Sequence, residues 1–170
     1  MLTPQQLFAR LADLGIPHDT VEHAPVFTVE QAKSHRGVLP GHHIKNLFLR
    51  NKKEEMWLVV ALEDRTIDLK QLGERLGAGR LSFGSPERLR KYLGVEPGSV
   101  TPFSVVNDTA HSVRLVLDRA LQDGGPINAH PLTNTMTSAI ALADLLRFFE
   151  ATGHAVSWLD FGVRAGDLGP

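Results

Sequence analysis

Apolar residues recur at helical spacing in several short segments, and each segment follows a recognisable starting signal. In "LFARLADLG" the apolar positions lie three and four residues apart, after Thr3 and Pro4 and before Gly15. A threonine N-cap, a proline at the first helical position and a glutamine three residues after the cap suit the start of a helix, and glycine commonly ends one. Similar signals stand at 28–31 before "AKSHRG", at 68–71 before "LGERLG" and at 85–87 before "RLRKYLG". The pattern predicts four short helices, each ending at a glycine.

Segments that favour strands alternate with these helices. "HHIKNLFLR" at 42–50 and "MWLVVAL" at 56–62 are separated by the polar "NKKEE", which predicts a hairpin. The second segment is apolar on both faces, as expected of a central strand. Further strands are predicted in "PFSVVND", "SVRLVLD", "PINAHPL", "NTMTSAIAL" and "VSWLDF", and a last helix in "ADLLRFFEATGH".

The order of these elements indicates the fold class. Helices and hairpins are mixed, without steady alternation of strand and helix, which favours an α+β fold with a mixed, mostly antiparallel sheet packed with short helices. The chain contains no long linker, low-complexity segment or fixed-period repeat. We therefore expect one domain over residues 1–163, followed by a C-terminal tail at 164–170.

Composition and charge narrow the possible functions. The 170 residues include no cysteine, which excludes a disulfide framework, a thiolate metal site and a cysteine nucleophile. A net charge of −1 argues against a strongly basic nucleic-acid binder, so any nucleic-acid contact is expected to be local, and no DNA partner is expected. The basic segment 75–91 also fits a solvated helix face. Polar residues interrupt the N-terminal apolar pattern and no run approaches a membrane span, so we expect a cytoplasmic protein without a signal peptide or membrane partner.

Familiar catalytic signatures are missing from the sequence. There is no phosphate-binding loop, no H-E-x-x-H and no G-x-S-x-G. Eight histidines raise the question of a metal, but His42 and His43 are adjacent and would point to opposite faces of a strand. We therefore expect no metal and no cofactor.

Lys45 is a candidate functional residue near the start of the strand at 42–50. It shares one strand face with Leu47 and Leu49, while Asn46 lies on the other face with Phe48. Both faces are apolar beyond this point, so the lysine stem should pack against the core with its ammonium at the rim. This placement fits either an ordinary surface lysine or a fixed cation at the mouth of a pocket, suited to a phosphate.

Asn128 and His130 form a second candidate cluster, in "NAHP". Pro131 biases His130 toward an extended conformation, so the two polar side chains should face the same way. This pattern fits a hydrogen-bonded, partly buried histidine, and it also fits the wall of a pocket.

The segment "GVEPGSVTP" at 94–102 predicts a shaped loop. Gly98 permits a sharp turn, and Pro102 braces the end of the G-x-x-x-P segment that includes Ser99, Val100 and Thr101. Such a loop can direct backbone N–H groups at an anion or at a developing oxyanion. The bare pattern is weak, because many turns match it.

Together these segments resemble one family. The chain resembles the freestanding aminoacyl-tRNA deacylases of the bacterial prolyl-tRNA editing superfamily, also called the YbaK/ProX or insertion-domain-like family. The resemblance runs over nearly the whole chain, through "VEHAPVFTVEQA", "HHIKNLFLRNKKEEMWLVV", "LSFGSPERLRKYLGVEPGSVTPF", "NAHPLTNTMT" and "DLLRFFEATGHAVSWLDF". The "NAHPLTNTMT" segment is similar to the branch that clears alanine from proline tRNA.

The resemblance implies an activity and a role for each candidate residue. The activity is trans-editing hydrolysis of Ala-tRNA(Pro), with the acceptor end of aminoacylated tRNA as partner and no cofactor. Lys45 would contact the terminal nucleotide, with Asn46 beside it, and His130 would line the amino-acid pocket with Asn128. The catalytic substrate loop would comprise Gly98, Ser99, Val100 and Thr101, braced by Pro102, and its amides would hold the ester carbonyl.

Some alternatives stay open at this stage. The same fold could act on Cys-tRNA(Pro) or another aminoacyl-tRNA, and a non-catalytic nucleic-acid-binding module is a further alternative. Oligomeric state is not indicated. One departure from the family pattern is the apolar "IALAD" before the last helix, where polar capping residues are expected, and it puts the start of that helix in question.

Overall fold

A computed structural model describes residues 1–25 and 39–162 of the chain. The helical elements are α1 (Pro4–Asp13), α3 (Leu69–Leu76), α4 (Pro86–Arg88), a π-helical turn η1 (Leu89–Leu93), the 3-10 helices η2 (Pro102–Asn107) and η3 (Arg119–Asp123), and α5 (Leu142–Thr152). The strands are β1 (Asp19–Glu22), β2 (His42–Arg50), β3 (Met56–Leu62), β4 (Ser82–Phe83), β5 (Val113–Asp118), β6 (Pro126–Ala129), β7 (Met136–Ala141) and β8 (Val156–Leu159).

The described strands form one mixed sheet in the order β1-β7-β6-β2-β3-β5-β8, with β4 added to β2. Four strand pairs are antiparallel, namely β1–β7, β2–β3, β2–β4 and β6–β7. Three pairs are parallel, namely β2–β6, β3–β5 and β5–β8. The α+β prediction with a mostly antiparallel sheet is confirmed, as is the hairpin of β2 and β3 and the central place of β3.

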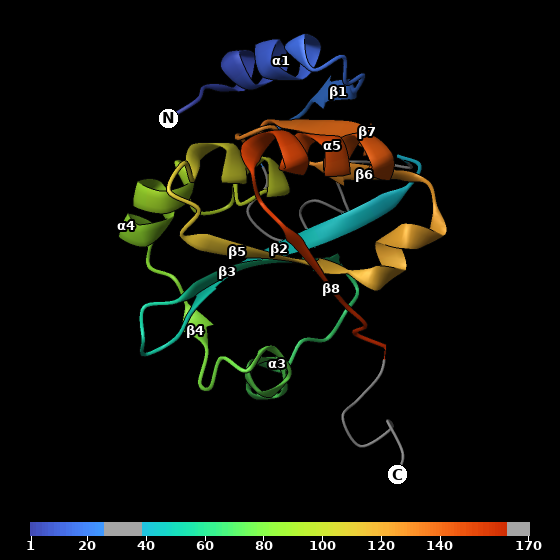
Figure 1. The fold of residues 1–170 in the computed structure, drawn as a ribbon. Helices are drawn as coiled ribbons and strands as arrows, with labels where there is room; N and C mark the ends of the chain where they lie inside the picture. Colours follow the sequence, from blue (N-terminus) through green and yellow to red (C-terminus); the bar gives the residue numbers. More distant parts are fainter. Residues whose placement is uncertain (26–38, 163–170) are drawn as a thin grey trace.

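Alternating side chains of the central strands build two separate apolar cores. Phe48 and Leu58 belong to the larger core, which α1, η1, η2 and α5 cover. Leu49 and Trp57, their neighbours in sequence, belong to a smaller core under α3. Figure 1 shows α3 and α5 on opposite sides of the sheet. Period-2 alternation explains this division, because successive strand side chains point to opposite faces.

The starting signals of the described helices work as expected. Thr3 and Gln6 form a reciprocal capping box at α1. Asp68 caps α3 through the amides of Lys70 and Gln71, and the Ser85 hydroxyl caps α4. The predicted helix that starts at 28–31 lies outside the described residues, as does the tail at 164–170.

One predicted strand is wrong. The segment "PFSVVND" is the 3-10 helix η2, not a strand. Thr101 accepts a hydrogen bond from the Phe103 amide, and Pro102 occupies the first helical position. Proline has a fixed φ suited to a helix start, so the local capping chemistry outweighs the strand preference of the two valines.

The last helix starts without a side-chain cap, as its apolar approach suggested. Ala141 is the N-cap of α5 and offers no hydrogen bond. Asp144 in the first turn supplies negative charge at the positive end of the helix dipole. Packing holds the helix instead, since Leu145, Phe148 and Phe149 are buried.

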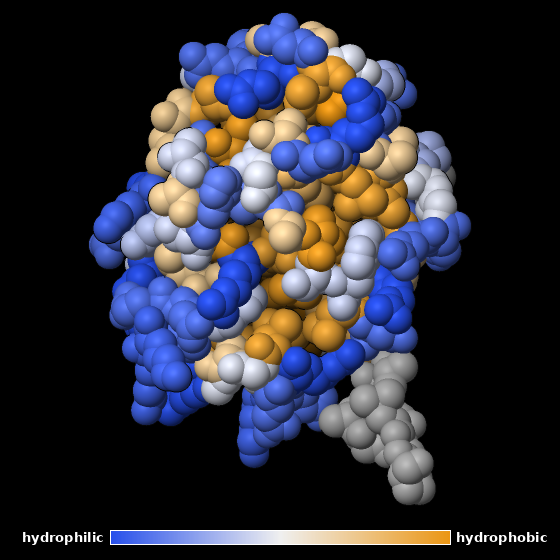
Figure 2. Space-filling model, in the orientation of Figure 1, coloured by the Kyte–Doolittle hydropathy of each residue, from blue (hydrophilic) through white to orange (hydrophobic). Residues whose placement is uncertain are grey.

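On the face that carries α5 and β8, apolar residues gather between polar margins (Figure 2). Leu142, Leu146, Val156 and Trp158 are only partly buried there against the larger core. None of the helices in residues 1–25 and 39–162 is long and apolar enough to cross a membrane.

Candidate active site

The edge of β2 that faces away from β3 is paired with other described strands only at its two ends. β6 pairs with His42 and His43, whereas β4 pairs with Leu49 and Arg50. Between these two short ladders, β2 pairs with β3 alone among the described strands. Lys45 and Asn46 lie in this interval, where no other described strand pairs with β2 on the side away from β3.

Lys45 projects from the face of β2 that bears Leu47 and Leu49, as predicted. It is half-buried, and its ammonium donates a hydrogen bond to the carbonyl oxygen of Arg65. Burial lowers the pKa of Lys45 by removing water from the ammonium, and attraction to Asp64 acts in the opposite direction. An ammonium has three N–H donors, and the bond to Arg65 uses one of them.

Asn46 points to the other face of the sheet. Its side-chain oxygen Oδ1 is buried and accepts no hydrogen bond from the described residues. Because a buried acceptor without a donor costs free energy, this atom is suited to receive a donor from elsewhere.

The G-x-x-x-P loop has the shape that its sequence predicts. Gly98 has φ +90°, a backbone conformation that glycine adopts easily and other residues do not. The Ser99 amide already donates to the carbonyl of Glu96 at 3.0 Å, and Pro102 has no N–H. The amides of Gly98 and Val100 are therefore the loop donors best suited to a ligand oxygen, because Thr101 is fully buried.

The side chain of Thr101 stabilises the start of η2. Thr101 is fully buried, and its hydroxyl oxygen accepts from the amide of Phe103 at the start of η2. The Ser104 hydroxyl donates to the Thr101 carbonyl at 2.5 Å. These bonds tie the end of the loop to the main core.

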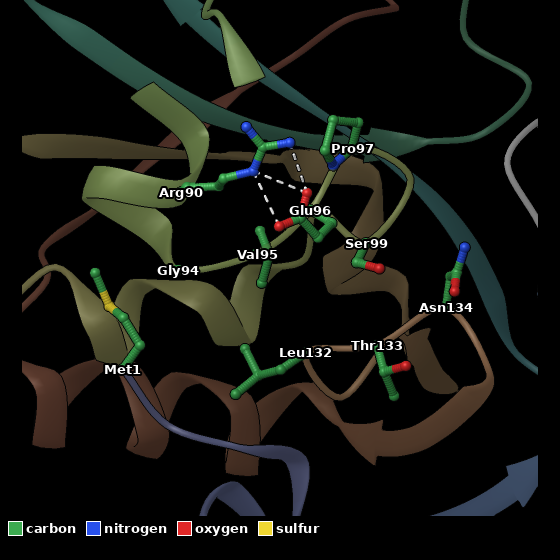
Figure 3. A pocket seen from close by; sticks show the side chains of 10 residues that line it. All are labelled: Met1, Arg90, Gly94, Val95, Glu96, Pro97, Ser99, Leu132, Thr133 and Asn134. Carbon is green, nitrogen blue, oxygen red and sulfur yellow. Dashed lines mark hydrogen bonds and ion pairs between the residues drawn. The ribbon is translucent and has the colours of Figure 1, made fainter. Parts of the chain in front are cut away.

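The loop and the segment after His130 line one pocket of about 490 Å³. Figure 3 shows Val95 to Ser99 on one side and Leu132 to Asn134 on the other, with the Arg90–Glu96 ion pair at the margin. A hollow of this volume is within the range of small-molecule sites. Two of the three segments that the sequence singled out therefore meet in space.

His130 has a defined hydrogen-bonding state. Its Nδ1 lies 2.9 Å from the carbonyl oxygen of Met136, and a carbonyl can only accept, so Nδ1 carries the proton. In the neutral ring Nε2 is then an acceptor. Burial lowers the pKa of His130; the hydrogen bond to Met136 raises it, and the charge of His23 lowers it further. The net shift is downward, which favours the neutral ring near pH 7.

His23 is a neighbour of His130 that the sequence did not single out as a site residue. The two ring centroids lie 6.0 Å apart, and His23 Nε2 is 2.8 Å from the hydroxyl of Thr137. The His23 amide donates to the carbonyl of Thr135 at 2.9 Å. His23 belongs to the "VEHAP" stretch that contributed to the family resemblance, but nothing local in that stretch indicates its contact with residues more than a hundred positions away.

Asn128 braces the chain beside the site. It is 6% exposed, and its amide nitrogen donates to the carbonyls of Pro40 and His42 at 3.0 and 3.1 Å. These two hydrogen bonds fix the chain that leads into β2.

Lys45 and the loop lie toward different faces of the sheet. Val100 packs against the larger core, whereas the strand face of Lys45 adjoins the smaller one. The sequence did not single out Arg65, whose carbonyl accepts from Lys45, or Asp118, which binds the Arg65 side chain, because no local pattern connects them.

Within the part of the chain that the structure describes, no three histidine or carboxylate side chains are grouped so that they could hold a metal ion.

Comparisons with known proteins show the family to which the chain belongs. The chain belongs to the family of aminoacyl-tRNA editing domains, whose model matches residues 23–148. Prolyl-tRNA synthetase associated domain-containing protein 1 of Danio rerio is 44% identical over 153 residues, which make up 89% of this chain and 83% of that protein. Prolyl-tRNA editing protein ProX of Acetoanaerobium sticklandii is 38% identical over 151 residues, or 88% of this chain and 92% of that protein.

A solved structure described as a proposed trans-editing enzyme for prolyl tRNA synthetase has the same fold. It superposes with a TM-score of 0.70 over 94% of this chain and 99% of that one, at 22% identity. The predicted family is confirmed by these matches.

Proposed function

We propose that this protein hydrolyses the ester bond of Ala-tRNA(Pro), releasing alanine and free tRNA. Membership of the aminoacyl-tRNA editing domain family supports a deacylase, and a relative named as a prolyl-tRNA editing protein supports the proline system. Because aminoacyl-tRNA is used in translation, the proposed place of action is the cytoplasm.

The observation that carries the proposal is the hydrogen-bonding state of His130, two residues before the 132–134 turn that shares a pocket with the G-x-x-x-P loop. Its Nδ1 is committed to the Met136 carbonyl, so Nε2 is an acceptor while the ring is neutral. We assign this nitrogen to the ammonium group of the bound alanine. The pocket that Ser99 and the 132–134 turn share brings the loop next to this part of the chain.

The remaining residues divide the work of binding and catalysis. Lys45 pairs with a phosphate of the tRNA acceptor end, and Asn46 offers its unpaired Oδ1 to a substrate donor. The amides of Gly98 and Val100 hold the ester carbonyl and stabilise the oxyanion that forms when water attacks it, and the buried Thr101 supports this end of the loop. One such donor contributes about 3 kcal/mol to lowering the barrier.

The chemistry needs no covalent intermediate. An aminoacyl ester is activated, and the chain has no cysteine nucleophile. Water attacks the carbonyl carbon, the tetrahedral intermediate collapses, and the ribose oxygen leaves with a proton. A ribose hydroxyl of the terminal adenosine assists the attack in this proposal, as the family resemblance implies.

Alanine is the expected amino acid because a synthetase site that selects by size can exclude amino acids larger than its substrate but not smaller ones. Alanine is smaller than proline, so a proline site cannot exclude it sterically. Each missing methylene gives only about 1–3 kcal/mol of discrimination. A second, smaller pocket that accepts alanine and rejects proline corrects the error.

A deacylation panel tests the proposal. Proline tRNA charged with labelled alanine, cysteine or proline is incubated with the parent protein and with the Lys45→Ala variant as a matched control. We expect hydrolysis of the alanine ester by the parent, little by the control, and survival of the proline ester. Preferential loss of the cysteine ester would assign the protein to a cysteine-specific deacylase, and binding of all three without hydrolysis would make it a nucleic-acid-binding module.

A further inference from the structure

Arg65 is held by a buried carboxylate at the end of a neighbouring strand. Its Nε lies 3.0 Å from Asp118 Oδ2 and its Nη2 lies 3.3 Å from Asp118 Oδ1, so the contact is bidentate. The Asp118 side chain is completely buried, whereas 27% of the Arg65 side chain is exposed. A two-point contact of this kind fixes the guanidinium in orientation as well as position.

Backbone amides complete the surroundings of Asp118. The amide of Leu62, the last residue of β3, donates to Oδ2 at 3.2 Å. The amide of Ala120 donates to Oδ1 at 3.0 Å. Asp118 thus connects the end of β3, the Arg65 side chain and the start of η3.

The short turn after β3 is fixed at both ends. The Arg65 amide donates to the Leu62 carbonyl at 3.0 Å, and the Glu63 amide donates to the His43 carbonyl on β2 at 2.9 Å. With Arg65 also tied to Asp118, the direction of the Arg65 carbonyl is set. That carbonyl is the oxygen that receives the Lys45 ammonium.

We infer that Asp118 and Arg65 are positioning residues for Lys45. The ion pair holds the turn so that the Arg65 carbonyl takes one N–H of the ammonium and directs the other two toward the substrate phosphate. The inference rests on the proposed function in one respect, namely that Lys45 binds substrate. It adds two residues, 53 positions apart in the chain, that touch no substrate themselves.

This arrangement addresses a weakness of lysine as a phosphate ligand. Its four-carbon stem is flexible, and ordering it on binding costs free energy. A carbonyl that holds the ammonium beforehand reduces that cost. Loss of the support should therefore affect hydrolysis even when Lys45 itself is unchanged.

The test compares Arg65→Met, Arg65→Lys and Asp118→Asn with Arg114→Met. Arg114 is a matched control on β5, because it is also an arginine in an ion pair, with Glu55, but it lies at the other end of that strand. Lysine amines are methylated with ¹³C-formaldehyde, and the Lys45 signal is assigned by its loss in Lys45→Arg. Its titration is followed by NMR in each variant, and hydrolysis of Ala-tRNA(Pro) is measured on unlabelled protein.

We expect the pKa of the Lys45 amine to rise toward that of an ordinary lysine in Arg65→Met and Asp118→Asn, because the freed ammonium reaches water. Hydrolysis should fall about 10- to 100-fold, since a small misplacement of a substrate contact has effects of this order. Arg65→Lys should partly restore the parental pKa of Lys45 and the parental rate of hydrolysis. Arg114→Met should match the parent in both the pKa and the rate.

An unchanged Lys45 titration in a folded Arg65→Met variant would overturn the inference, whatever happens to the rate. An altered titration with a parental rate would overturn it as well. If Asp118→Asn does not fold, the Arg65→Met variant alone tests the inference. In that variant Asp118 keeps the hydrogen bonds from the amides of Leu62 and Ala120. An altered titration in a protein whose parent does not hydrolyse Ala-tRNA(Pro) would support the positioning contact while rejecting the proposed function.

Discussion

Gly98 contributes to the site through its backbone. Its φ of +90° is easy for glycine and strained for a β-branched residue. Ser99 adds a nearly buried hydroxyl at the pocket, and its amide is already used within the loop. If the loop works through amides, its shape should matter more than its side chains.

Gly98→Val should therefore reduce hydrolysis of Ala-tRNA(Pro) far more than Ser99→Ala. We expect a loss of about 100-fold or more for the valine variant, the size seen when one oxyanion donor is removed, and a loss below about 10-fold for the alanine variant. Single-turnover rates at saturating enzyme measure the difference. The reverse order would identify the Ser99 hydroxyl as the working group.

Lys45→Ala should separate activity from stability. The residue is half-buried and makes one hydrogen bond to a carbonyl, so its removal should change the melting temperature only slightly. Hydrolysis should fall by about 100-fold because the ester is no longer held in place. Lys45→Arg should recover part of the rate, since a planar guanidinium differs in shape from an ammonium. A parental rate in Lys45→Ala would remove Lys45 from the mechanism.

His23 should control the pH at which His130 becomes charged. Burial and the charge of His23 both lower the pKa of His130, so His23→Ala should raise that pKa by exposing the ring and removing the repulsion. Activity needs the neutral ring in our proposal and is lost as pH falls through the pKa. The acid limb of the pH–rate profile should therefore move to higher pH in His23→Ala. His18→Ala, which alters a histidine bound to Thr20 instead, should leave the limb in place.

At the scale of elements, a buried hydrogen-bonded pair joins the segment before β5 to the segment after α5. His154 Nε2 lies 2.9 Å from Asp108 Oδ2, and both side chains are buried. Asp108 also accepts from the amides of Ser112 and Val113 at 3.0 and 2.9 Å. Burial raises the pKa of Asp108, but the hydrogen bonds from His154 and these amides outweigh it, so the net shift is downward.

Asp108→Ala should lower the free energy of unfolding by about 3–5 kcal/mol, the usual result of removing one partner of a buried pair. Urea unfolding measures the loss, with Glu96→Gln, in an exposed pair with Arg90, as a control that should change little. Because the folded-state pKa of Asp108 is depressed, its contribution is present above the unfolded pKa and is lost as pH falls through the folded value. The difference in the free energy of unfolding between the parent and Asp108→Ala should therefore become smaller in strong acid. A variant as stable as the parent would contradict the assigned role.

At the scale of the whole molecule, the two cores place the candidate residues on different sides of one sheet. The larger core supports the G-x-x-x-P loop through η2, and the smaller core supports the strand face of Lys45. The interval of β2 between its ladders with β6 and β4 is where these two sides meet. A substrate as large as a tRNA acceptor end can contact both at once.

Excess chelator should leave hydrolysis undiminished. The proposed chemistry uses backbone amides, Lys45 and His130, and it assigns no step to a metal ion. The rate on Ala-tRNA(Pro) is measured after dialysis against EDTA, with magnesium restored to a parallel sample to separate effects on tRNA folding. Loss of the rate that only zinc or another transition metal restores would replace the mechanism proposed here.

The sequence by itself determined the features that depend on neighbours along the chain. Thr3, Asp68 and Ser85 mark helix starts because an N-cap bonds to amides two or three residues ahead. The apolar pattern of β3 identified it as central because strand side chains alternate between two covered faces. The error at η2 was also local: Thr101 and Pro102 give the same signal for a helix start, and the strand prediction relied on the two valines instead.

Only the tertiary structure decided which distant residues cooperate. The bond between Arg65 and Asp118, the contact of His23 with His130 and the use of Asn128 to hold Pro40 all follow from strand pairing. Arg65 and Asp118 are 53 positions apart in the chain, and Asn128 and Pro40 are 88 apart. His23 and His130 are more than 100 positions apart. Hydrogen bonds are short and directional, so whether two such groups meet depends on the register and twist of the whole sheet, which no local sequence pattern specifies.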